Sequence, residues 1–144
     1  MNETLLRNEI QYWEGIKYTV YLDSLGKPTV GIGHYDPTMI VGQQVIPSLV
    51  DMFYKQDSYN ALQIAQKSCN NFSQLDDVRA RLLVALCFNM GNKILQFKHM
   101  LAAIQSGDFD AAANELQNSL WFTQVGRRGP ESVEIMRSGN PLQT

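Results

Sequence analysis

The sequence has few residues that could form disulfide bonds or bind a metal. It contains two cysteines, Cys69 and Cys87, and two histidines, His34 and His99, in 144 residues. Disulfide-held domains carry four or more cysteines, and structural zinc sites use clusters of cysteine and histidine at short spacings. The chain has neither pattern, so we expect two reduced, half-buried thiols, no metal site and no other cofactor.

The chain also lacks an excess of charge of one sign. Its 12 basic and 14 acidic side chains give a formal net charge of −2. Proteins that bind nucleic acid through the phosphates normally carry a basic excess or a basic stripe. The only adjacent basic pair is Arg127–Arg128, so nucleic acid is not an expected partner.

Long apolar runs are missing as well. No stretch approaches the roughly 20 apolar residues of a membrane span, so membrane insertion is not expected. The opening residues, MNETLLRNEI, do not place a basic start before an apolar run, as a secretory signal peptide does. The sequence therefore predicts a protein that is made in the cytoplasm and does not export itself by an ordinary signal.

What the chain does contain is enough apolar sequence for a core. Hydrophobic residues make up 44% of its 144 residues, and this length is close to the commonest size of one domain. A chain of this size buries about 70% of the surface that it exposes when unfolded. We therefore predict a single domain over residues 1–144.

Strand-like sequence is confined to the N-terminal part. Apolar and polar residues alternate from Tyr18 to Asp23, the residues from Ser24 to Pro28 suit a turn, and a second apolar stretch begins at Thr29. This pattern predicts a short antiparallel hairpin with room for a third strand. A small sheet lobe over about residues 15–46 follows from it.

The remaining sequence has helical periodicity. Apolar spacing predicts helices at about 3–13, 47–68, 76–90, 95–105 and 109–118. Asp108 is the expected N-cap of the fifth helix, and Pro130 at a first position and Gly139 past the end bracket a sixth. The expected fold class is α+β, with the helix at about 47–68 connecting the sheet lobe to a mainly helical lobe at about 72–144, which also includes the helix at 3–13. A cleft between two lobes is a favoured place for a ligand.

Two carboxylates lie where such a fold brings chain segments together. Glu14 lies at the end of the first predicted helix, Asp23 follows by nine residues near the hairpin turn, and the returning strand begins at Thr29. Glycosidic cleavage needs one carboxyl to protonate the leaving oxygen and a second on the opposite face of the sugar. The negative end of the helix dipole disfavours a further negative charge at Glu14, which suits a proton donor. By spacing alone, however, a carboxylate at a helix end or turn is more often only solvated or capping.

Three ordered blocks give these residues a specific context. The first spans Glu14–His34 and contains EG, YLD and TVGIGH; the second is Phe88–Gly91, FNMG; the third spans Leu120–Arg128 and begins LWFTQ. Their order and spacing resemble the catalytic signature, central helix and tryptophan-containing C-terminal segment of the T-even-phage-type lysozymes, the endolysins. The resemblance covers the chain from about residue 3 to residue 139.

The resemblance implies a lysozyme-like fold and the activity of a glycoside hydrolase. Glu14 would be the general acid, Asp23 would act opposite it, and the hydroxyl of Thr29 would help to hold a water. Attack by that water inverts the anomeric centre and needs about 6.5–9.5 Å between the carboxyls. The bond cut would be the β-1,4 link from N-acetylmuramic acid to N-acetylglucosamine of peptidoglycan. Arg128 matches a family arginine that pairs with the catalytic glutamate, and we expect it among the substrate-binding residues.

Other residues of the blocks have expected places as well. The resemblance implies that His34 pairs with Asp57 and ties a strand end to the connecting helix, which is a structural role. Gly33 would let the backbone approach the sugar closely. Phe88 and Asn89 either face the cleft, as a stacking ring and a hydrogen-bonding amide, or are a core aromatic and an ordinary polar residue of a helix.

Two features depart from the family pattern, and both concern substrate binding. The segment between His34 and Pro47 is short and apolar, which suggests a trimmed cleft rim. The slightly acidic balance also differs from the basic balance common in these enzymes. The resemblance to phage endolysins implies a monomer that is made in the host cytoplasm. A membrane pore, the holin, would then give it access to the periplasm and cell wall.

Two further functions stay open at this point. A lytic transglycosylase on the same fold closes a 1,6-anhydro ring within the sugar, and holding a water at Asp23 and Thr29 would serve no purpose there. A non-catalytic wall-binding or virion module would keep the fold without needing Glu14, Asp23 and Thr29 together. The complete set therefore favours hydrolysis.

Overall fold

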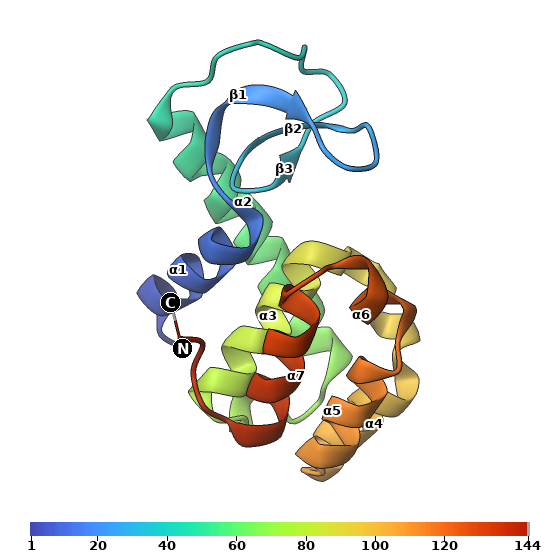
Figure 1. Ribbon diagram of the computed structural model, residues 1–144. Coiled ribbons are helices and arrows are strands. Elements are labelled where there is room, and N and C mark those ends of the chain that lie inside the picture. Colours follow the sequence, from blue (N-terminus) through green and yellow to red (C-terminus); the bar gives the residue numbers. More distant parts are fainter. Residues whose placement is uncertain (144) are drawn as a thin grey trace.

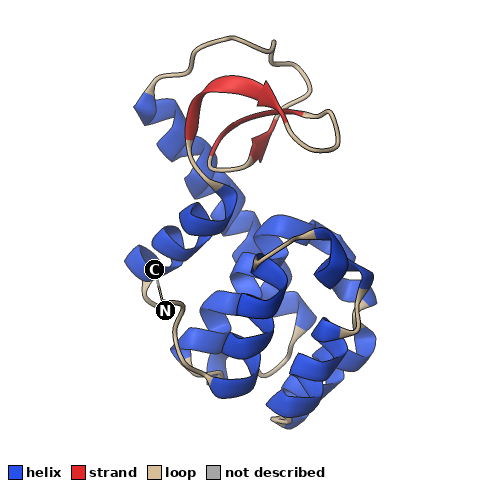
Figure 2. Ribbon diagram, in the orientation of Figure 1, coloured by secondary structure: helices blue, strands red, loops and turns tan. Residues whose placement is uncertain are grey.

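The computed structural model describes residues 1–143 and consists of two lobes joined by a long helix (Figure 1). The N-terminal lobe holds the three strands, and the other lobe is built from helices (Figure 2). This arrangement confirms the predicted α+β class. The first helix precedes the sheet in the chain but contacts helix α3 (Asp77–Met90) of the helical lobe.

Helix α1 (Glu3–Glu14) has a defined start and a defined end. The side chain of Asn2 accepts a hydrogen bond from the Leu5 backbone N–H at 3.0 Å and caps the first turn. Gly15 ends the helix with φ of 74°, a left-handed conformation that glycine adopts at little cost. Because the helix stops here, Glu14 lies where the chain passes into the sheet.

The sheet is antiparallel with the order β1-β2-β3. Its strands are β1 (Lys17–Leu22), β2 (Pro28–Gly31) and β3 (His34–Tyr35). Leu22 pairs with Pro28 at the turn, and Thr29 pairs with Tyr35 across β2 and β3. The predicted hairpin and its third strand are therefore confirmed, and residues 23–27 form the turn between the first two strands.

The segment between β3 and the next helix covers the outer edge of β1. The backbone N–H of Gly42 donates to the Val20 carbonyl at 2.9 Å, and that of Val45 donates to the Tyr18 carbonyl at 2.7 Å. These bonds satisfy polar groups that an open sheet edge would leave free. The apolar character of the segment appears instead on its exposed side chains, Ile40, Val41 and Ile46.

Helix α2 (Pro47–Ser68) connects the lobes and has the bounds that the sequence predicts. Pro47 is its first residue, a position where the missing N–H of proline costs no helical hydrogen bond. The buried face of α2 contacts both β2 and α3. It packs so closely on the sheet that a Cβ atom at Gly31 would meet Val50 Cγ1 at 3.0 Å.

The helical lobe surrounds α3. Its other helices are α4 (Lys98–Ser106), α5 (Phe109–Gln117), α6 (Leu120–Gln124) and α7 (Arg128–Ser138). Every residue of α3 from Ala80 to Cys87 is buried, so this helix is enclosed on most sides. Asp108 caps α5 as predicted, because its side chain accepts from the Ala111 N–H at 3.0 Å.

Three details of the helical lobe differ from the prediction. The single helix expected at 95–105 is divided into a 3-10 segment at 91–96 and α4, because Phe97 has the non-helical angles φ −82° and ψ 56°. The short helix α6 was not predicted. Helix α7 begins at Arg128, so placing Pro130 at its first position is wrong. Proline fits the third position equally well, because none of the first four N–H groups has a partner within the helix.

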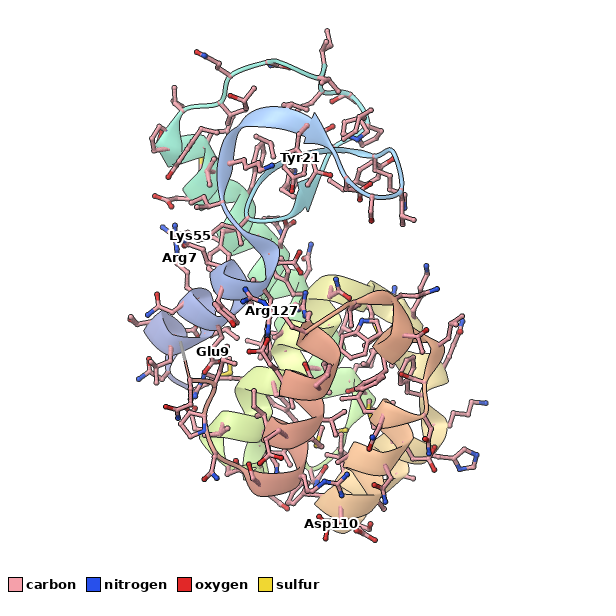
Figure 3. The ribbon with its side chains drawn as sticks, viewed as in Figure 1. Arg7, Glu9, Tyr21, Lys55, Asp110 and Arg127 are labelled. Carbon is pink, nitrogen blue, oxygen red and sulfur yellow. The ribbon has the colours of Figure 1, made fainter. Side chains whose placement is uncertain are left out.

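A buried ion pair fixes α1 to the helical lobe. The guanidinium of Arg81, which is 2% exposed, donates through Nε and Nη2 to Glu9 Oε1 at 3.1 and 2.9 Å. Arg81 also bonds to Asp77. Figure 3 shows Glu9 on the side of α1 that faces this lobe. Removing one partner of such a pair leaves a buried charge without compensation, so α1 is held firmly.

The two cysteines belong to the core. Cys69 and Cys87 are free, and both are wholly buried rather than half-buried as expected. Burial raises the pKa of Cys87 to about 12, so this thiol stays protonated and unreactive. Among residues 1–143, no three His, Cys, Asp or Glu side chains gather as metal ligands do. Within the same range, no helix is both long and apolar enough to traverse a bilayer.

Candidate active site

A cleft of about 1460 Å³ lies between the lobes and collects most of the predicted site residues. From the first helix, sheet and hairpin turn it is lined by Glu14, Tyr21, Asp23, Thr29, Gly33 and His34, and from the helices by Asp57, Phe88, Asn89 and Trp121. None of the residues 36–46 that the structure describes is among its lining. The apolar segment therefore forms the outer edge of the sheet lobe and not the cleft rim.

Glu14 has one carboxyl oxygen held and the other close to the sheet. Oε1 accepts a hydrogen bond from Arg128 Nη1 at 2.6 Å, and the side chain is 17% exposed. Oε2 lies against Gly33, where an added Cβ atom would come within 2.7 Å of it. Gly33 itself has φ of 64°, so both its backbone and its lack of a side chain serve this contact.

Arg128 lies behind Glu14 and not in the cleft. It is 6% exposed, and its Nη2 donates to the Ala85 carbonyl of α3 at 3.0 Å. Its guanidinium carbon lies 5.0 Å from the centroid of the Trp13 ring. We expected Arg128 among the substrate-binding residues, but the structure shows it in contact with the glutamate and the core.

Asp23 follows β1 and is oriented by its own turn. Oδ1 accepts hydrogen bonds from the backbone N–H groups of Leu25 at 2.8 Å and Lys27 at 2.9 Å. This side chain-to-backbone pattern is typical of aspartate in turns. The second oxygen, Oδ2, accepts no hydrogen bond from residues 1–143. The turn therefore fixes the carboxylate and leaves one oxygen available on the cleft wall.

Thr29 lies on β2 opposite Tyr21 of β1 and lines the same cleft as Asp23. The threonine is 5% exposed, and its hydroxyl donates to the Lys27 carbonyl at 2.9 Å. A hydroxyl has one proton to donate and two lone pairs to accept with. Since its proton is already engaged, Thr29 Oγ1 can only accept a further hydrogen bond, for example from a water.

Tyr21 is a cleft residue that the sequence interpretation did not assign. Tyr21 lines the cleft together with Glu14 and Asp23, and burial, followed by the negative charges of these two carboxylates, raises the pKa of Tyr21. The ammonium of Lys17 lies 4.2 Å from the ring centroid, and Figure 3 shows Tyr21 on the sheet. The YLD motif could have indicated this position, because residues two apart along a strand, such as Tyr21 and Asp23, share one face.

His34 and Asp57 join the end of the sheet to α2. His34 Nδ1 lies 2.7 Å from Asp57 Oδ2. The imidazole also stacks on Phe53 of α2, with ring centroids 4.0 Å apart and planes at 8°. The histidine is thus held by two residues of the connecting helix.

Phe88 and Asn89 lie at the end of α3 and line the opposite side of the cleft. Asn89 Oδ1 accepts a hydrogen bond from Trp121 Nε1 at 2.8 Å, which fixes the amide and leaves its NH₂ group as a donor. Phe88 is partly buried, and its ring centroid lies 6.0 Å from that of Tyr54. Both expected alternatives therefore apply to Phe88, which is a core aromatic with one edge in the cleft.

We predict that Gly33→Ala disables this site. The new methyl group would push the Glu14 carboxyl away from its place beside Arg128, and a displacement of about 1 Å costs on the order of 10²-fold in rate. The positive φ adds a stability cost of roughly 1–2 kcal/mol for a residue with a Cβ atom. Initial rates of cell-wall lysis and thermal melting measure the two effects separately.

Gly42→Ala is the matched control. Gly42 has φ of 92°, and nothing lies within 4 Å of a Cβ atom there. We expect the same kind of backbone strain with little loss of activity per folded molecule. If Gly33→Ala loses no more activity than Gly42→Ala, contact between Gly33 and Glu14 has no part in the function.

Comparisons with known proteins agree with this architecture. The chain matches the model of the phage lysozyme family over residues 11–133. It is 28% identical to "Probable T4-type lysozyme 1" of Dictyostelium discoideum, in an alignment that covers 93% of this chain and 94% of that protein. It is 28% identical to the pre-baseplate central spike protein Gp5 of Enterobacteria phage T4, where 88% of the chain aligns with 26% of that protein. It is 25% identical to the peptidoglycan hydrolase gp36 of Pseudomonas phage phiKMV, where 90% aligns with 15%.

Since the family match spans most of the chain and the cleft has its carboxylates in place, the protein is a lysozyme, a hydrolase of peptidoglycan. It belongs to the phage lysozyme family.

Proposed function

We propose that this enzyme hydrolyses the β-1,4 bond between N-acetylmuramic acid and N-acetylglucosamine in one step, with inversion at the anomeric carbon. Glu14 is the general acid and Asp23 is the general base. The observation that carries the proposal is that Glu14, Asp23 and Thr29 line one cleft. Each has one hydrogen-bonding group engaged by the protein and another free for substrate or water.

The acid step uses the oxygen of Glu14 that Arg128 does not hold. The protonated carboxyl donates to the glycosidic oxygen as the bond to the anomeric carbon breaks. Arg128, 2.6 Å from Oε1, then stabilises the carboxylate that remains. Because an opposite charge favours the ionised form, the arginine stabilises the product of proton transfer more than the starting acid.

The water step uses the sheet side of the cleft. A water donates one hydrogen bond to Thr29 Oγ1 and the other to the free oxygen of Asp23, so that a lone pair faces the anomeric carbon. As the new C–O bond forms, one water proton passes to Asp23. This arrangement needs about 6.5–9.5 Å between the two carboxyls, the separation typical of inverting glycosidases.

The glycan would lie between the sheet turn and the end of α3. The free NH₂ group of Asn89 suits the carbonyl of an N-acetyl group, and Phe88 offers a ring edge to a sugar face. Gly33 lets the backbone of the sheet lobe approach the glycan beside Glu14. Both sides of the cleft therefore contribute contacts to the glycan, and the contacts made by Gly33, Phe88 and Asn89 involve no charge.

For the biological role, we propose host lysis. The enzyme would act as a monomer made in the host cytoplasm, and a holin would open its way to the periplasm and wall. A second role is supported by one relative, since the region similar to this chain forms only 26% of the pre-baseplate central spike protein Gp5. In that role the enzyme would act on the wall as part of a virion.

Product analysis tests the reaction. Purified peptidoglycan is digested in H₂¹⁸O, and the fragments are examined by mass spectrometry. We expect reducing N-acetylmuramic acid ends that carry one ¹⁸O atom. Ends with a 1,6-anhydro ring and no label would identify a transglycosylase, and unchanged glycan would identify a non-catalytic module.

We predict that Thr29→Ala lowers kcat by about 10²-fold, because the attacking water loses one of its two acceptors. Melting should fall by much less, since the Lys27 carbonyl that the hydroxyl bonds to lies in an exposed turn. Thr29→Ser keeps the hydroxyl and should restore most of the rate. If Thr29→Ala lowers the melting temperature strongly and Thr29→Ser does not restore the rate, Thr29 serves packing and not catalysis.

A further inference from the structure

Two buried polar atoms behind the active site have no hydrogen-bond partner among the described residues. They are Arg128 Nε and Ser132 Oγ. Ser132 is 0% exposed and Arg128 is 6% exposed. Buried polar groups are almost always hydrogen-bonded, to protein or to ordered water, because an unsatisfied one costs about 1–3 kcal/mol. Two such groups in one place therefore need an explanation.

Both residues belong to the same face of α7. They are four residues apart, a spacing that puts side chains one above the other with Cβ atoms about 5–6 Å apart. A water between α7 and α3 on this face can hydrogen-bond to both Arg128 Nε and Ser132 Oγ, at about 2.8 Å from each. The site is closed by α3, whose Ala85 carbonyl already accepts from Arg128 Nη2.

The usual partner of a helical serine does not explain Ser132. In this chain Ser138 Oγ donates to the Glu134 carbonyl at 2.8 Å, four residues back on the same helix. Ser132 makes no such bond to the residue four positions before it, which is Arg128. Its hydroxyl is therefore available to a group on the side where the Arg128 side chain lies.

We propose that a single buried water bridges Arg128 Nε and Ser132 Oγ, and that Ser132 acts through it as a positioning residue for the Arg128–Glu14 pair. The proposal rests on the role of Glu14 as the acid. Nη1 bonds to Glu14 and Nη2 to the Ala85 carbonyl. The bridge is the third anchor of the guanidinium.

The third anchor matters because the guanidinium is planar. Bonds at Nη1 and Nη2 alone allow the plane to tilt about the line that joins their partners, whereas a bond at Nε fixes the tilt. A fixed plane keeps Nη1 aligned with Glu14 Oε1 at 2.6 Å. Since Arg128 does not line the cleft, loosening it changes the proton-transfer step and leaves substrate binding unaffected.

The bridge is tested by nuclear magnetic resonance on the whole ¹⁵N-labelled enzyme without substrate. We expect a nuclear Overhauser contact between a long-lived water and the Arg128 Nε proton in the unaltered protein. Ser132→Thr keeps the hydroxyl and should keep this contact. Ser132→Val has the same shape as the threonine variant but no hydroxyl, so it should abolish the contact. Ser132→Ala replaces Ser132→Val if the valine variant does not fold. Ser138→Ala, on the same helix, is the control and should leave the contact in place.

Kinetics tests the positioning role. We expect Ser132→Val to lower kcat about tenfold, equal to about 1.4 kcal/mol, with KM unchanged, and Ser132→Thr to restore kcat. The absence of a water contact in the unaltered enzyme, its persistence in Ser132→Val, or an unchanged kcat in that variant would overturn the proposal. The resonance measurement needs no turnover, so it stays decisive even if Glu14 proves not to be the acid.

Discussion

Glu14→Gln should be folded and inactive. The substitution removes the proton that the leaving oxygen needs, and a positioned acid contributes about 10²–10⁴-fold to the rate. The amide oxygen can still accept from Arg128 Nη1, which bonds to Glu14 at 2.6 Å in the native protein. Packing behind the cleft is therefore preserved, and the melting temperature falls only because the buried Arg128 loses its charged partner. Lysis rates on permeabilised Gram-negative cells and a thermal melt measure the two properties.

Glu9→Gln is the matched control for this variant. Glu9 lies on the same helix and is likewise paired with a buried arginine, Arg81, but it does not line the cleft. We expect Glu9→Gln to melt at a lower temperature, because Arg81 loses a bidentate partner, and to keep its activity per folded molecule. Near-normal lysis by Glu14→Gln would remove Glu14 from the mechanism.

Asp23→Asn has the second largest expected effect. The asparagine oxygen can still accept from the N–H groups of Leu25 and Lys27, which bond to Oδ1 at 2.8 and 2.9 Å, so the turn is retained. The negative charge that accepts the water proton is lost. We expect kcat to fall on the order of 10²–10⁴-fold, the contribution of a general base, with a small change in KM.

Asp36→Asn separates the chemistry of Asp23 from its place in a turn. Asp36 Oδ1 accepts from the backbone N–H and the hydroxyl of Thr38, and the pKa of Asp36 is lowered by these hydrogen bonds. It is a turn aspartate of the same lobe that does not line the cleft. If both variants lose activity equally, the effect of Asp23→Asn comes from a disturbed lobe and not from a missing base.

The two carboxylates are held by different lobes. Glu9 and Glu14 each bond to an arginine of the helical lobe, Arg81 and Arg128, so α1 and the proposed acid are fixed to that lobe. Asp23, in the turn after β1, and Thr29, on β2, belong to the sheet lobe. The separation between the carboxyls therefore depends on how the sheet lobe sits against the helical lobe, which α2 controls.

The sequence predicts the fold best where a strong local signal marks an element. Pro47 at the first position and a long helical periodicity give α2 its observed bounds, and glycine after Glu14 gives α1 its end. The division at Phe97 and the short helix α6 have no such signal, because they are set by packing against other helices. Local propensity is routinely overridden by tertiary contacts of this kind.

The motif predicted the cleft residues and the pairing of Arg128 with Glu14, but other contacts that hold the site were not predicted. Glu14, Asp23 and Thr29 are all found on the cleft wall, as the resemblance suggested. The partner of Arg81 was invisible in the sequence, since Glu9 lies 72 positions away. The sequence also gives no sign that Ser132 is important, because a serine in a helix normally bonds to a backbone carbonyl of the preceding turn. These contacts become visible only when the packing of α1, α3 and α7 is known.

The stereochemistry of the first product tests the central claim most directly. Proton magnetic resonance, recorded within minutes of adding enzyme to a soluble peptidoglycan fragment, distinguishes the two anomers of the new reducing end. A water that attacks between Glu14 and Asp23 gives the α anomer first, since the bond proposed to be cut is a β link. Initial formation of the β anomer would mean a covalent sugar intermediate, and the water between the two acids would have to be given up.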